Sequence, residues 1–422
     1  MSETAVDVVV QIAGDDVLVG RLWSHRRRGN ESATFAYLPD YLTRPDAYEL
    51  DPALPLVTGQ QQTPVGRALF GAFSDCAPDR WGRRLMQRGE RRRARHERTA
   101  ERSFGEVDYL LGVRDDLRQG ALRFRDPDTG AYLADDVTGV PSLLELPRLM
   151  AAAERLEREE ATAEDLVTLQ RGGSSLGGAR PKAHVLDRDG RIAIAKLPSP
   201  TTDEWDVIRW EAVAHSLARR SGVTVPHSDA HVFGDKAILV LDRFDRHGDH
   251  RVGYVSAMTM LEATDGEAGS YLDVADVIGR HAPSATADLR ELWRRIAFSI
   301  LISNTDDHLR NHGFLRTSSA GWTLSPAFDL NPDPTPGPKR LTTAVDYDDR
   351  SASIELLMEV AEHFRLSSDE ARAVLGEVLS GTRQWRAQAR ALGFGAAAIE
   401  LMEPAFEHEQ AAAATELVGA MA

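Results

Sequence analysis

The chain has 422 residues and a formal net charge of −15 at pH 7, with 42% hydrophobic and 27% charged residues. This composition is typical of a globular protein, and the length predicts two or three domains. The negative charge argues against a surface that is basic throughout, as broad nucleic-acid binding requires. Because Cys76 is the only cysteine, an intrachain disulfide and a cysteine-based zinc site are excluded, and we expect a buried thiol.

The sequence also bears on location. No stretch approaches the roughly 18 uninterrupted apolar residues of a membrane span. The start MSETAVDVVVQ lacks the charged and then apolar pattern of a signal sequence. We therefore expect a cytoplasmic protein without membrane contact.

Near the N-terminus three runs alternate apolar and polar residues: VDVVVQI, VLVGRLWS and SATFAYLP. This alternation predicts strands, with a turn at Gly14-Asp15-Asp16, and hence a small β-rich module. A strongly basic stretch follows at residues 80–102, with a smaller one at 25–29. The long stretch has helical spacing. We interpret it as a solvated helix face, with contact to a polyanion or a partner as the alternative.

The middle of the chain combines helical and strand patterns. A helix-compatible Ala/Glu stretch occupies residues 143–167, and a Gly-rich loop, SSLGGARPK, begins at Ser174. KAHVL and RIAIAK then predict a hairpin around the turn DRDG. We expect the next helix to begin near Asp203, with a capping box of Thr201 and Glu204. DAHVFG and KAILVLDRF predict two further strands.

Beyond residue 250 helical patterns dominate, in LRELWRRIAFSILISN, IELLMEVAEHF, DEARAVLGEVLS and the Ala-rich tail. One hairpin, GFLRT and WTLSP, interrupts them. The whole pattern predicts an α+β fold with a mostly helical C-terminal part.

Phosphoryl transfer needs carboxylates that hold magnesium and a base beside the attacking hydroxyl. In NTDDHLRN, Asp306 and Asn311 are five residues apart, the spacing of base and metal-binding amide in the protein-kinase catalytic loop. An apolar helix precedes this loop, and a short hairpin follows it and leads to Asp329, which fits the magnesium-binding aspartate. Asp307 is the rival for the base, and capping of the loop by these side chains is the structural alternative.

Lys196 ends the strand RIAIAK, where alternation places it on the same face as Ile192 and Ile194. A lysine on an apolar face needs an anionic partner, because an unpaired buried charge is costly. Glu211 on the next predicted helix shares its inward face. We therefore expect an ion pair between Lys196 and Glu211, either structural or part of a nucleotide site.

Gly177 and Gly178 allow the close backbone approach by which amides bind phosphate. No GK[ST] sequence follows, so a P-loop ATPase is disfavoured. Asp242, Arg243 and Phe244 end the last predicted strand of this part. In a kinase-like fold this is where the lobes join and adenine binds.

In this order, SSLGGARPK, IAKLP, RWE, LDRFDR, NTDDHLRNHGF and SPAFDLNP resemble the HipA family of toxin kinases. Upstream, FGAFSDCAPDRWGRRLM and GALRF are similar to the N-terminal module of that family. The resemblance implies a bilobal protein-kinase-like fold. Its expected domains are an N-terminal module at 1–117, an N lobe at 118–243 and a helical C lobe at 244–422.

The resemblance also implies roles for single residues. Asp306 becomes the catalytic base, Asn311 and Asp329 become the magnesium ligands, and Ser175, or Ser174 beside it, becomes a self-inactivating phosphorylation site. The residues implied in binding ATP are Gly177, Gly178, Ala179, Arg180, Pro181, Lys182, Lys196, Asp242, Arg243, Phe244, His308, Leu309, Arg310, Asn311, Phe328 and Asp329.

At the level of function, the resemblance implies a serine/threonine protein kinase that uses ATP and Mg²⁺ and acts as a growth-arresting toxin. The implied partners are a small helix-turn-helix antitoxin, DNA indirectly through the antitoxin complex, and a protein substrate; some relatives target aminoacyl-tRNA synthetases. The alternatives are a small-molecule kinase and a catalytically silent scaffold in a DNA-bound repressor complex. A metal-dependent hydrolase built on Asp306, Asp307, His308 and His312 lacks a distant second cluster of ligands.

Overall fold

The computed structural model describes residues 3–27, 29–134, 139–173, 180–267 and 269–419. The chain forms two compact units: Met1–Glu204 with His231–Val255, and Trp205–Ala230 with Ser256–Ala422. Within the described ranges, none of the helices combines the length and the apolar character that a membrane crossing needs.

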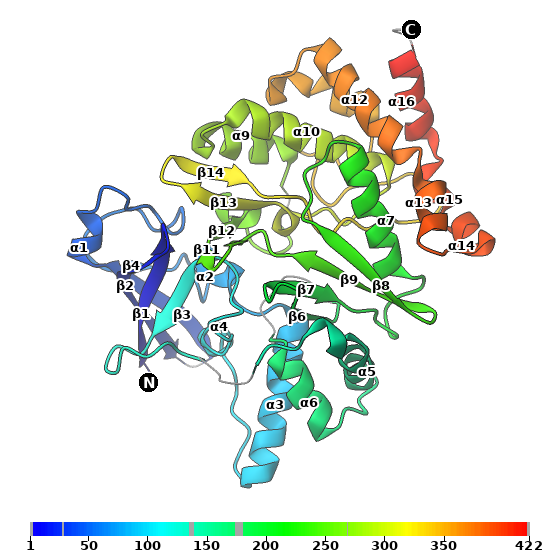
Figure 1. Ribbon diagram of the computed structural model, residues 1–422. Coiled ribbons are helices and arrows are strands. Elements are labelled where there is room, and N and C mark those ends of the chain that lie inside the picture. Colours follow the sequence, from blue (N-terminus) through cyan, green and yellow to red (C-terminus); the bar gives the residue numbers. More distant parts are fainter. Residues whose placement is uncertain (1–2, 28, 135–138, 174–179, 268, 420–422) are drawn as a thin grey trace. The chain divides into compact units, whose positions relative to one another are not determined.

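The first unit begins with an antiparallel sheet in the order β4-β3-β2-β1-β5 (Figure 1). Its strands are β1 (Glu3–Ile12), β2 (Asp15–Arg27), β3 (Asn30–Tyr37), β4 (Gln61–Gln62) and β5 (Leu122–Arg125). The predicted β-rich module is thus present. The first turn lies at Ala13 and Gly14, one residue before the predicted position, and both have positive φ. Phe35, Phe73 and Phe124 pack together in the core of this sheet.

The rest of the first unit is a small sheet with helices. Its elements are α1 (Pro39–Leu42), α2 (Gly71–Asp75), α3 (Arg80–Glu97), α4 (Glu106–Leu111), α5 (Leu146–Glu157), α6 (Ala163–Arg171), β6 (Lys182–Leu186), β7 (Ile192–Lys196), β9 (Lys236–Asp242), β10 (Arg246–His247) and β11 (His250–Arg251). Strands β8 (Ser228–Phe233) and β12 (Gly253–Ser256) cross the boundaries between units. Leu149, Leu169 and Val185 belong to one buried cluster that joins α5 and α6 to the sheet.

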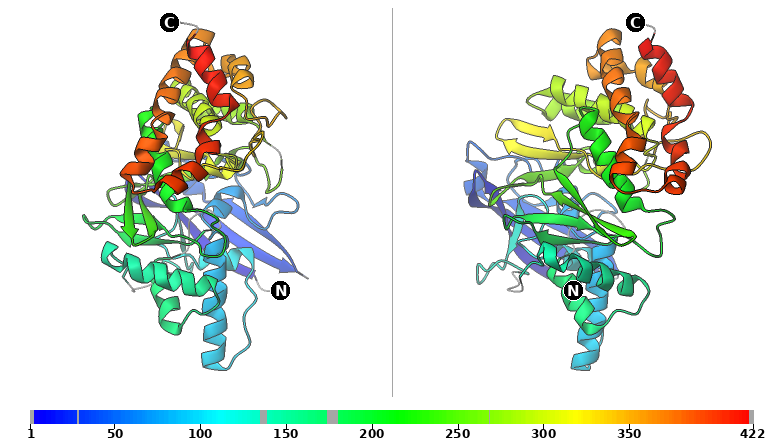
Figure 2. Two further views of the ribbon diagram at one scale, coloured as in Figure 1. Left: turned by 90° about the vertical axis from the view of Figure 1, so that its right-hand side faces the viewer. Right: turned by 45° about the vertical axis from the view of Figure 1, so that its right-hand side comes forward.

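The second unit is mostly helical, and Figure 2 shows α12 and α16 side by side in two views. Its elements are α7 (Val207–Arg220), α8 (Ala257–Met260), α9 (Tyr271–His281), α10 (Ala285–Leu301), β13 (Gly313–Ser318), β14 (Gly321–Leu324), α11 (Ile354–Glu359), α12 (Ser368–Thr382), α13 (Trp385–Ala391), α14 (Ala396–Leu401), α15 (Glu403–Phe406) and α16 (Glu409–Gly419). Short 3-10 helices span Leu309–Asn311 and Ala361–Phe364 in this unit and Leu143–Glu145 in the first unit. The apolar side of α10 is the centre of this unit, where Trp293 and Phe298 are fully buried.

One predicted helix start was wrong. Helix α7 begins at Val207, because the Asp206 side chain accepts a hydrogen bond from the N–H of Arg209 and caps the helix there. The predicted cap residue Thr201 instead lies in a turn in which the Asp203 carboxylate accepts from the N–H of Ser199 at 2.8 Å. The mixed α and β content and the buried Cys76, which is 3% exposed, agree with the sequence predictions.

Candidate active site

The loop that carries Asp306 follows directly after a helix of the second unit that is largely buried, α10. Helix α10 ends at Leu301, and Ser303 turns the chain sharply with a φ of 54°. The 3-10 helix Leu309–Asn311 ends the loop, and β13 follows. The loop is therefore held between two rigid elements, as a catalytic constellation requires.

The two adjacent aspartates of this loop have different environments. Asp306 is exposed, and its backbone oxygen accepts hydrogen bonds from the Asn311 side chain at 3.1 Å and the N–H of His308 at 3.0 Å. Asp307 is 5% exposed, and its carboxylate accepts from Tyr271 at 2.7 Å and Ser299 at 3.2 Å. These contacts give Asp307 a structural environment and leave Asp306 at the surface of the loop.

Electrostatics support this distinction. Burial alone would raise the pKa of Asp307, but the nearby His312 ring at 3.2 Å and the hydrogen bonds that the carboxylate accepts hold it below its usual range. Burial and the same carboxylate raise the pKa of the Tyr271 hydroxyl well above its usual value, so this hydroxyl remains a donor. Asp307 is thus a buried anion that anchors the loop to the helices beneath it.

The segment that carries Asp329 lies beside this loop. The Asn304 side-chain oxygen accepts from the N–H of Asn331 at 3.1 Å, and the Ser303 carbonyl accepts from the N–H of Asp333 at 3.2 Å. Asp329 itself adopts the left-handed conformation, with a φ of 60°. Such backbone conformations cost about 1–3 kcal/mol and cluster at functional sites.

A metal site can be assessed from the donor groups. Within the described ranges, no group of three or more His, Cys, Asp or Glu side chains could hold a metal ion. Asn311 and Asp329 nevertheless offer amide and carboxylate oxygens, the ligand types that Mg²⁺ prefers when water and phosphate oxygens complete its shell. The Asn311 nitrogen is used by the Asp306 carbonyl, which leaves its side-chain oxygen as the acceptor. The donor set therefore fits Mg²⁺ without a dedicated protein cage.

The neighbouring residues of the 3-10 helix differ in their contacts. Arg310 forms a two-pronged ion pair with Asp265 at 3.0 and 3.1 Å. His308 is half-buried, and its Nδ1 has no hydrogen-bond partner in the part of the chain that the structure describes. Leu309 is buried, so a ligand contact from this residue has to come from its backbone.

In the first unit, strands β6 and β7, which carry predicted phosphate-binding residues, form a hairpin. Lys182 at the start of β6 lies opposite Lys196 at the end of β7. The Lys182 ammonium is buried and lies 2.9 Å from the Asp79 carboxylate, which also caps α3. Trp81 donates to the Lys182 carbonyl at 3.1 Å. The start of α3 thereby fixes the chain where it leaves the Gly-rich loop.

Several predicted residues of that loop lie outside the described ones: Ser174, Ser175, Gly177, Gly178 and Ala179. At its end, Arg180 donates to Asp203 at 2.9 Å, and the Pro181 carbonyl accepts from the N–H of Leu197.

Lys196 shares a face of β7 with Ile192 and Ile194, as predicted, but this face is not the core side of the strand. The fully buried residues of β7 are Ala193 and Ala195, whereas Ile194 and Lys196 share the half-buried face. Small alanines, and not the isoleucines, therefore form the core side of this strand. Glu211 is buried as predicted, and its carboxylate lies 3.9 Å from His215. Lys196 and Glu211 belong to different units, so their ion pair stays a prediction.

The segment after β9 is held by a polar network that the sequence analysis did not identify. Asp245 is 3% exposed and accepts two hydrogen bonds from Arg243 at 2.9 and 2.6 Å, and one from the N–H of Gly120 at 2.7 Å. Arg243 also donates to the carbonyls of Leu117 and Arg118. Because the Arg243 guanidinium is occupied in this way, a nucleotide contact from Arg243 has to come from its backbone. The repeated Asp-Arg pairs in LDRFDR are the signal that could have revealed this network.

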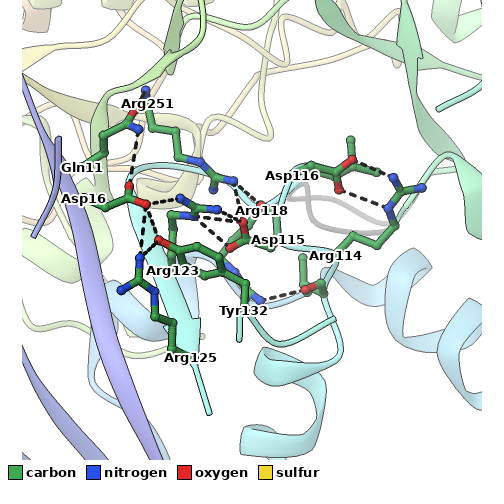
Figure 3. Close-up of polar contacts among 12 residues, drawn as sticks. Gln11, Asp16, Arg114, Asp115, Asp116, Arg118, Arg123, Arg125, Tyr132 and Arg251 are labelled. Carbon is green, nitrogen blue, oxygen red and sulfur yellow. Dashed lines mark hydrogen bonds and ion pairs between the residues drawn. The ribbon is translucent and has the colours of Figure 1, made fainter. Parts of the chain in front are cut away.

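Figure 3 shows the adjoining contacts around Asp115. Arg123 donates to Asp115 at 2.9 Å and to Asp16 at 2.6 Å, and Arg251 donates to the Asp115 carboxylate at 3.1 Å. The N–H of Arg251 also donates to Gln11 at 2.6 Å. Buried and half-buried polar contacts thus join the N-terminal sheet, which includes β5, to Asp115 and Arg251.

Comparisons with known proteins agree with the motifs. Residues 10–107 match the model of the HipA N-terminal domain, and residues 174–386 match that of the HipA-like C-terminal domain. A chain of the structure described as the Shewanella oneidensis MR-1 toxin antitoxin system HipA, HipB and its operator DNA complex superposes with a TM-score of 0.66 at 16% identity. The match covers 98% of this chain and 96% of that chain, and it shows a common fold.

Two curated relatives match over shorter parts. A putative kinase of Haemophilus influenzae is 25% identical over an alignment of 179 residues, and the match covers 37% of this chain and 52% of that protein. The putative kinase Y4dM of Sinorhizobium fredii is 33% identical over 142 residues, which are 33% of this chain and 32% of that protein. The match to this chain therefore spans about half of the first relative and a third of the second.

Proposed function

Since the chain belongs to the HipA-like family, we propose that it is an ATP-dependent serine/threonine protein kinase. The observation that carries the proposal is a pair of hydrogen bonds between the Asp306 loop and the Asp329 segment, from the N–H of Asp333 to the Ser303 carbonyl and from the N–H of Asn331 to the Asn304 side chain. A kinase needs its base and its metal-binding carboxylate at a fixed separation, and these ties supply it.

In this proposal each loop has a separate task. The exposed Asp306 carboxylate orients the attacking hydroxyl and accepts its proton, while the buried Asp307 anchors the loop from below. The side-chain oxygen of Asn311 and the carboxylate of Asp329 hold Mg²⁺. When bound, this ion neutralises the negative charge of the transferred phosphate. His308, whose Nδ1 lacks a partner among the described residues, is positioned to contact a ligand.

In the first unit, Lys196 binds the phosphates, and the backbone of Asp242, Arg243 and Phe244 contacts adenine. The network around Asp245 fixes the backbone of this segment, because Arg243 is bonded both to Asp245 and to the carbonyls of 117 and 118. Arg180, Pro181 and Lys182 complete the end of the Gly-rich loop, and Phe328 precedes the metal-binding aspartate.

We further propose that the kinase is the toxin of a toxin-antitoxin pair that acts in the cytoplasm. A small helix-turn-helix antitoxin holds it in check and connects it to operator DNA. Its substrate is a cellular protein, and phosphorylation of its own Ser175, or of Ser174, silences it. The matched proteins support this proposal, since they include two putative kinases and a chain of a toxin-antitoxin complex with operator DNA.

Phosphoproteomics after induced expression tests the proposal in cells. Growth arrest and a new set of phosphoserine and phosphothreonine peptides are expected with the wild-type chain and not with Asp306→Asn. Identical phosphoproteomes with both chains would contradict the kinase activity. If the Asp306→Asn chain also arrests growth, without new phosphopeptides, the result would favour a binding protein over an enzyme.

A further inference from the structure

A concave site in the first unit plays no part in the proposed phosphoryl transfer. It lies between α3 and the α5–α6 pair, which run alongside each other in Figure 1. Its volume is about 270 Å³, and its lining residues are Arg88, Arg91, Arg92, Arg95, Leu156, Glu159, Ala161, Ala163 and Leu166. We call it the α3 groove.

The α3 groove carries an excess of positive charge. Four arginines and one glutamate line it, which gives a local charge of 4 − 1 = +3. Arg88 donates to Glu159 at 2.7 Å, and Arg92 donates to the Ala163 carbonyl at 2.8 Å. Across the described part of the chain, Arg95 has no side-chain hydrogen bond or ion pair. Most of the guanidinium N–H groups here therefore point to a ligand or to solvent.

Two arginines on other faces of α3 have close carboxylate partners. Arg83 forms a two-pronged ion pair with Glu106 at 2.5 and 2.7 Å. Arg93 donates to both oxygens of Glu90, at 2.9 and 2.7 Å, and holds the pKa of this glutamate at about 2. In the groove, Arg88 is bonded to Glu159, and Arg91 lies 3.7 Å from the exposed carboxylate of Glu101. The groove arginines are therefore less completely paired than Arg83 and Arg93, and most of their N–H groups remain available to a ligand.

The floor of the α3 groove is apolar. Leu156 is 2% exposed and Leu166 is 7% exposed, and the alanines 161 and 163 complete the floor. Arginines 88, 91, 92 and 95 follow one helical stripe with steps of about 5 Å along the axis. A ligand that fits both features alternates acidic groups at this spacing with apolar side chains.

This chemistry favours a peptide over a nucleic acid. No aromatic side chain on which a base could stack is among the lining residues, and the apolar floor offers no partner to a phosphate backbone. Arginine forms two-pronged hydrogen bonds with carboxylates, and the buried leucines match an apolar side chain.

We propose that the α3 groove binds an acidic peptide segment of a partner protein. Arg91, Arg92 and Arg95 take the carboxylates, and the floor around Leu156 and Leu166 takes apolar side chains of the segment. The site does not depend on the proposed kinase activity, because none of its residues is assigned to ATP or magnesium.

The test uses the full-length protein and a fluorescein-labelled 12-residue peptide of alternating Glu and Leu, followed by fluorescence anisotropy. The groove variant is Arg92→Ala with Arg95→Ala. The matched control, Arg27→Ala with Arg188→Ala, removes the same charge from exposed positions outside the groove. We expect the groove variant to weaken binding by about tenfold, because it removes two surface ion pairs with the peptide. The control should change the affinity by less than about twofold.

Two further probes complete the test. A Glu–Ser peptide of the same length should bind more weakly than the Glu–Leu peptide, because it leaves the apolar floor uncovered. A duplex DNA of 24 base pairs should bind more weakly than the peptide at equal salt. Equal losses in the groove variant and the control, equal affinity for both peptides, or preferential binding of DNA would each overturn the proposal. Unchanged thermal unfolding of both double variants shows that they remain folded.

Discussion

The side-chain oxygen of Asn304 accepts a 3.1 Å hydrogen bond from the backbone N–H of Asn331. Asn304 is 1% exposed, so this bond is shielded from water. This bond joins the loop of Asp306 to the segment of Asp329. Asn304, which provides it, is neither the predicted base nor a predicted metal ligand. A buried amide thus helps to fix the separation of the two carboxylates that we propose as base and metal ligand.

Replacing Asn304 tests this link. Asn304→Ala leaves the N–H of Asn331 without its partner, and the free energy of unfolding should fall by about 1–3 kcal/mol. The adjacent Ser303→Ala is the matched control, because the buried Ser303 hydroxyl has no hydrogen-bond partner among the described residues. Urea unfolding should show Ser303→Ala to be as stable as the wild type or more stable. Equal losses in the two variants would contradict the assignment.

Asp329→Ala should abolish the magnesium dependence of ATP affinity, since the variant removes the main carboxylate ligand. Isothermal titration calorimetry with and without Mg²⁺ measures this dependence. Asp348→Ala removes an exposed carboxylate of the same unit and should leave it intact. If Asp329→Ala retains the wild-type response to Mg²⁺, the metal assignment is wrong.

The Asp245 network predicts a specific dependence of stability on pH. Burial alone would raise the pKa of this carboxyl, but the guanidiniums of Arg243 and Arg246 hold it below its usual range. In the unfolded chain an Asp has a pKa of about 3.9. The stabilisation is therefore complete above about pH 4 and is lost as the pH falls further toward the folded-state pKa.

Asp245→Asn should lower the free energy of unfolding at pH 7 by about 3–5 kcal/mol, because it leaves buried Arg243 without its counter-charge. The variant should also lose less stability than the wild type between pH 5 and pH 3. Asp249→Asn, in the exposed turn between β10 and β11, is the control. Parallel pH profiles for Asp245→Asn and the wild type would refute the network as the source of acid sensitivity.

Self-inactivation is open to mass spectrometry. A phosphate on Ser175 or Ser174 adds about −1.5 to −2 charges to the loop whose amides we propose to bind the phosphates of ATP. We expect the modified peptide in wild-type protein and not in Asp306→Asn, and we expect the modified fraction to lose ATP binding. An unmodified peptide after long incubation with ATP and Mg²⁺ would remove self-inactivation and leave the kinase proposal in place.

Local sequence patterns predicted the elements that frame the site. The hairpin β13–β14 and helix α10 follow from alternation with period two and from helical spacing, which depend on neighbouring residues alone. The start of α7 was missed because several capping residues stand close together, and only the fold selects Asp206. The core face of β7 was misjudged because Ala193 and Ala195 bury less area than the isoleucines, yet they lie inside.

Contacts between distant parts of the chain were beyond these patterns. Asp245 bonds to Gly120 across 125 residues, and Asp79 pairs with Lys182. No local period encodes such pairs, since they depend on how the elements pack. The spacing of Asp306 and Asn311 also left Asp307 as a rival base. The buried hydrogen bonds of Asp307 with Tyr271 and Ser299 supply the physical reason to prefer Asp306.

The most direct test compares phosphate transfer from γ-labelled ATP by wild-type protein, Asp306→Asn and Asp307→Asn. Asp306→Asn keeps the shape of the side chain and removes the base, so transfer should fall by orders of magnitude while ATP affinity and thermal stability stay unchanged. Asp307→Asn should chiefly lower the melting temperature, because its buried anion holds the loop. Undiminished transfer by folded Asp306→Asn protein would contradict the central claim.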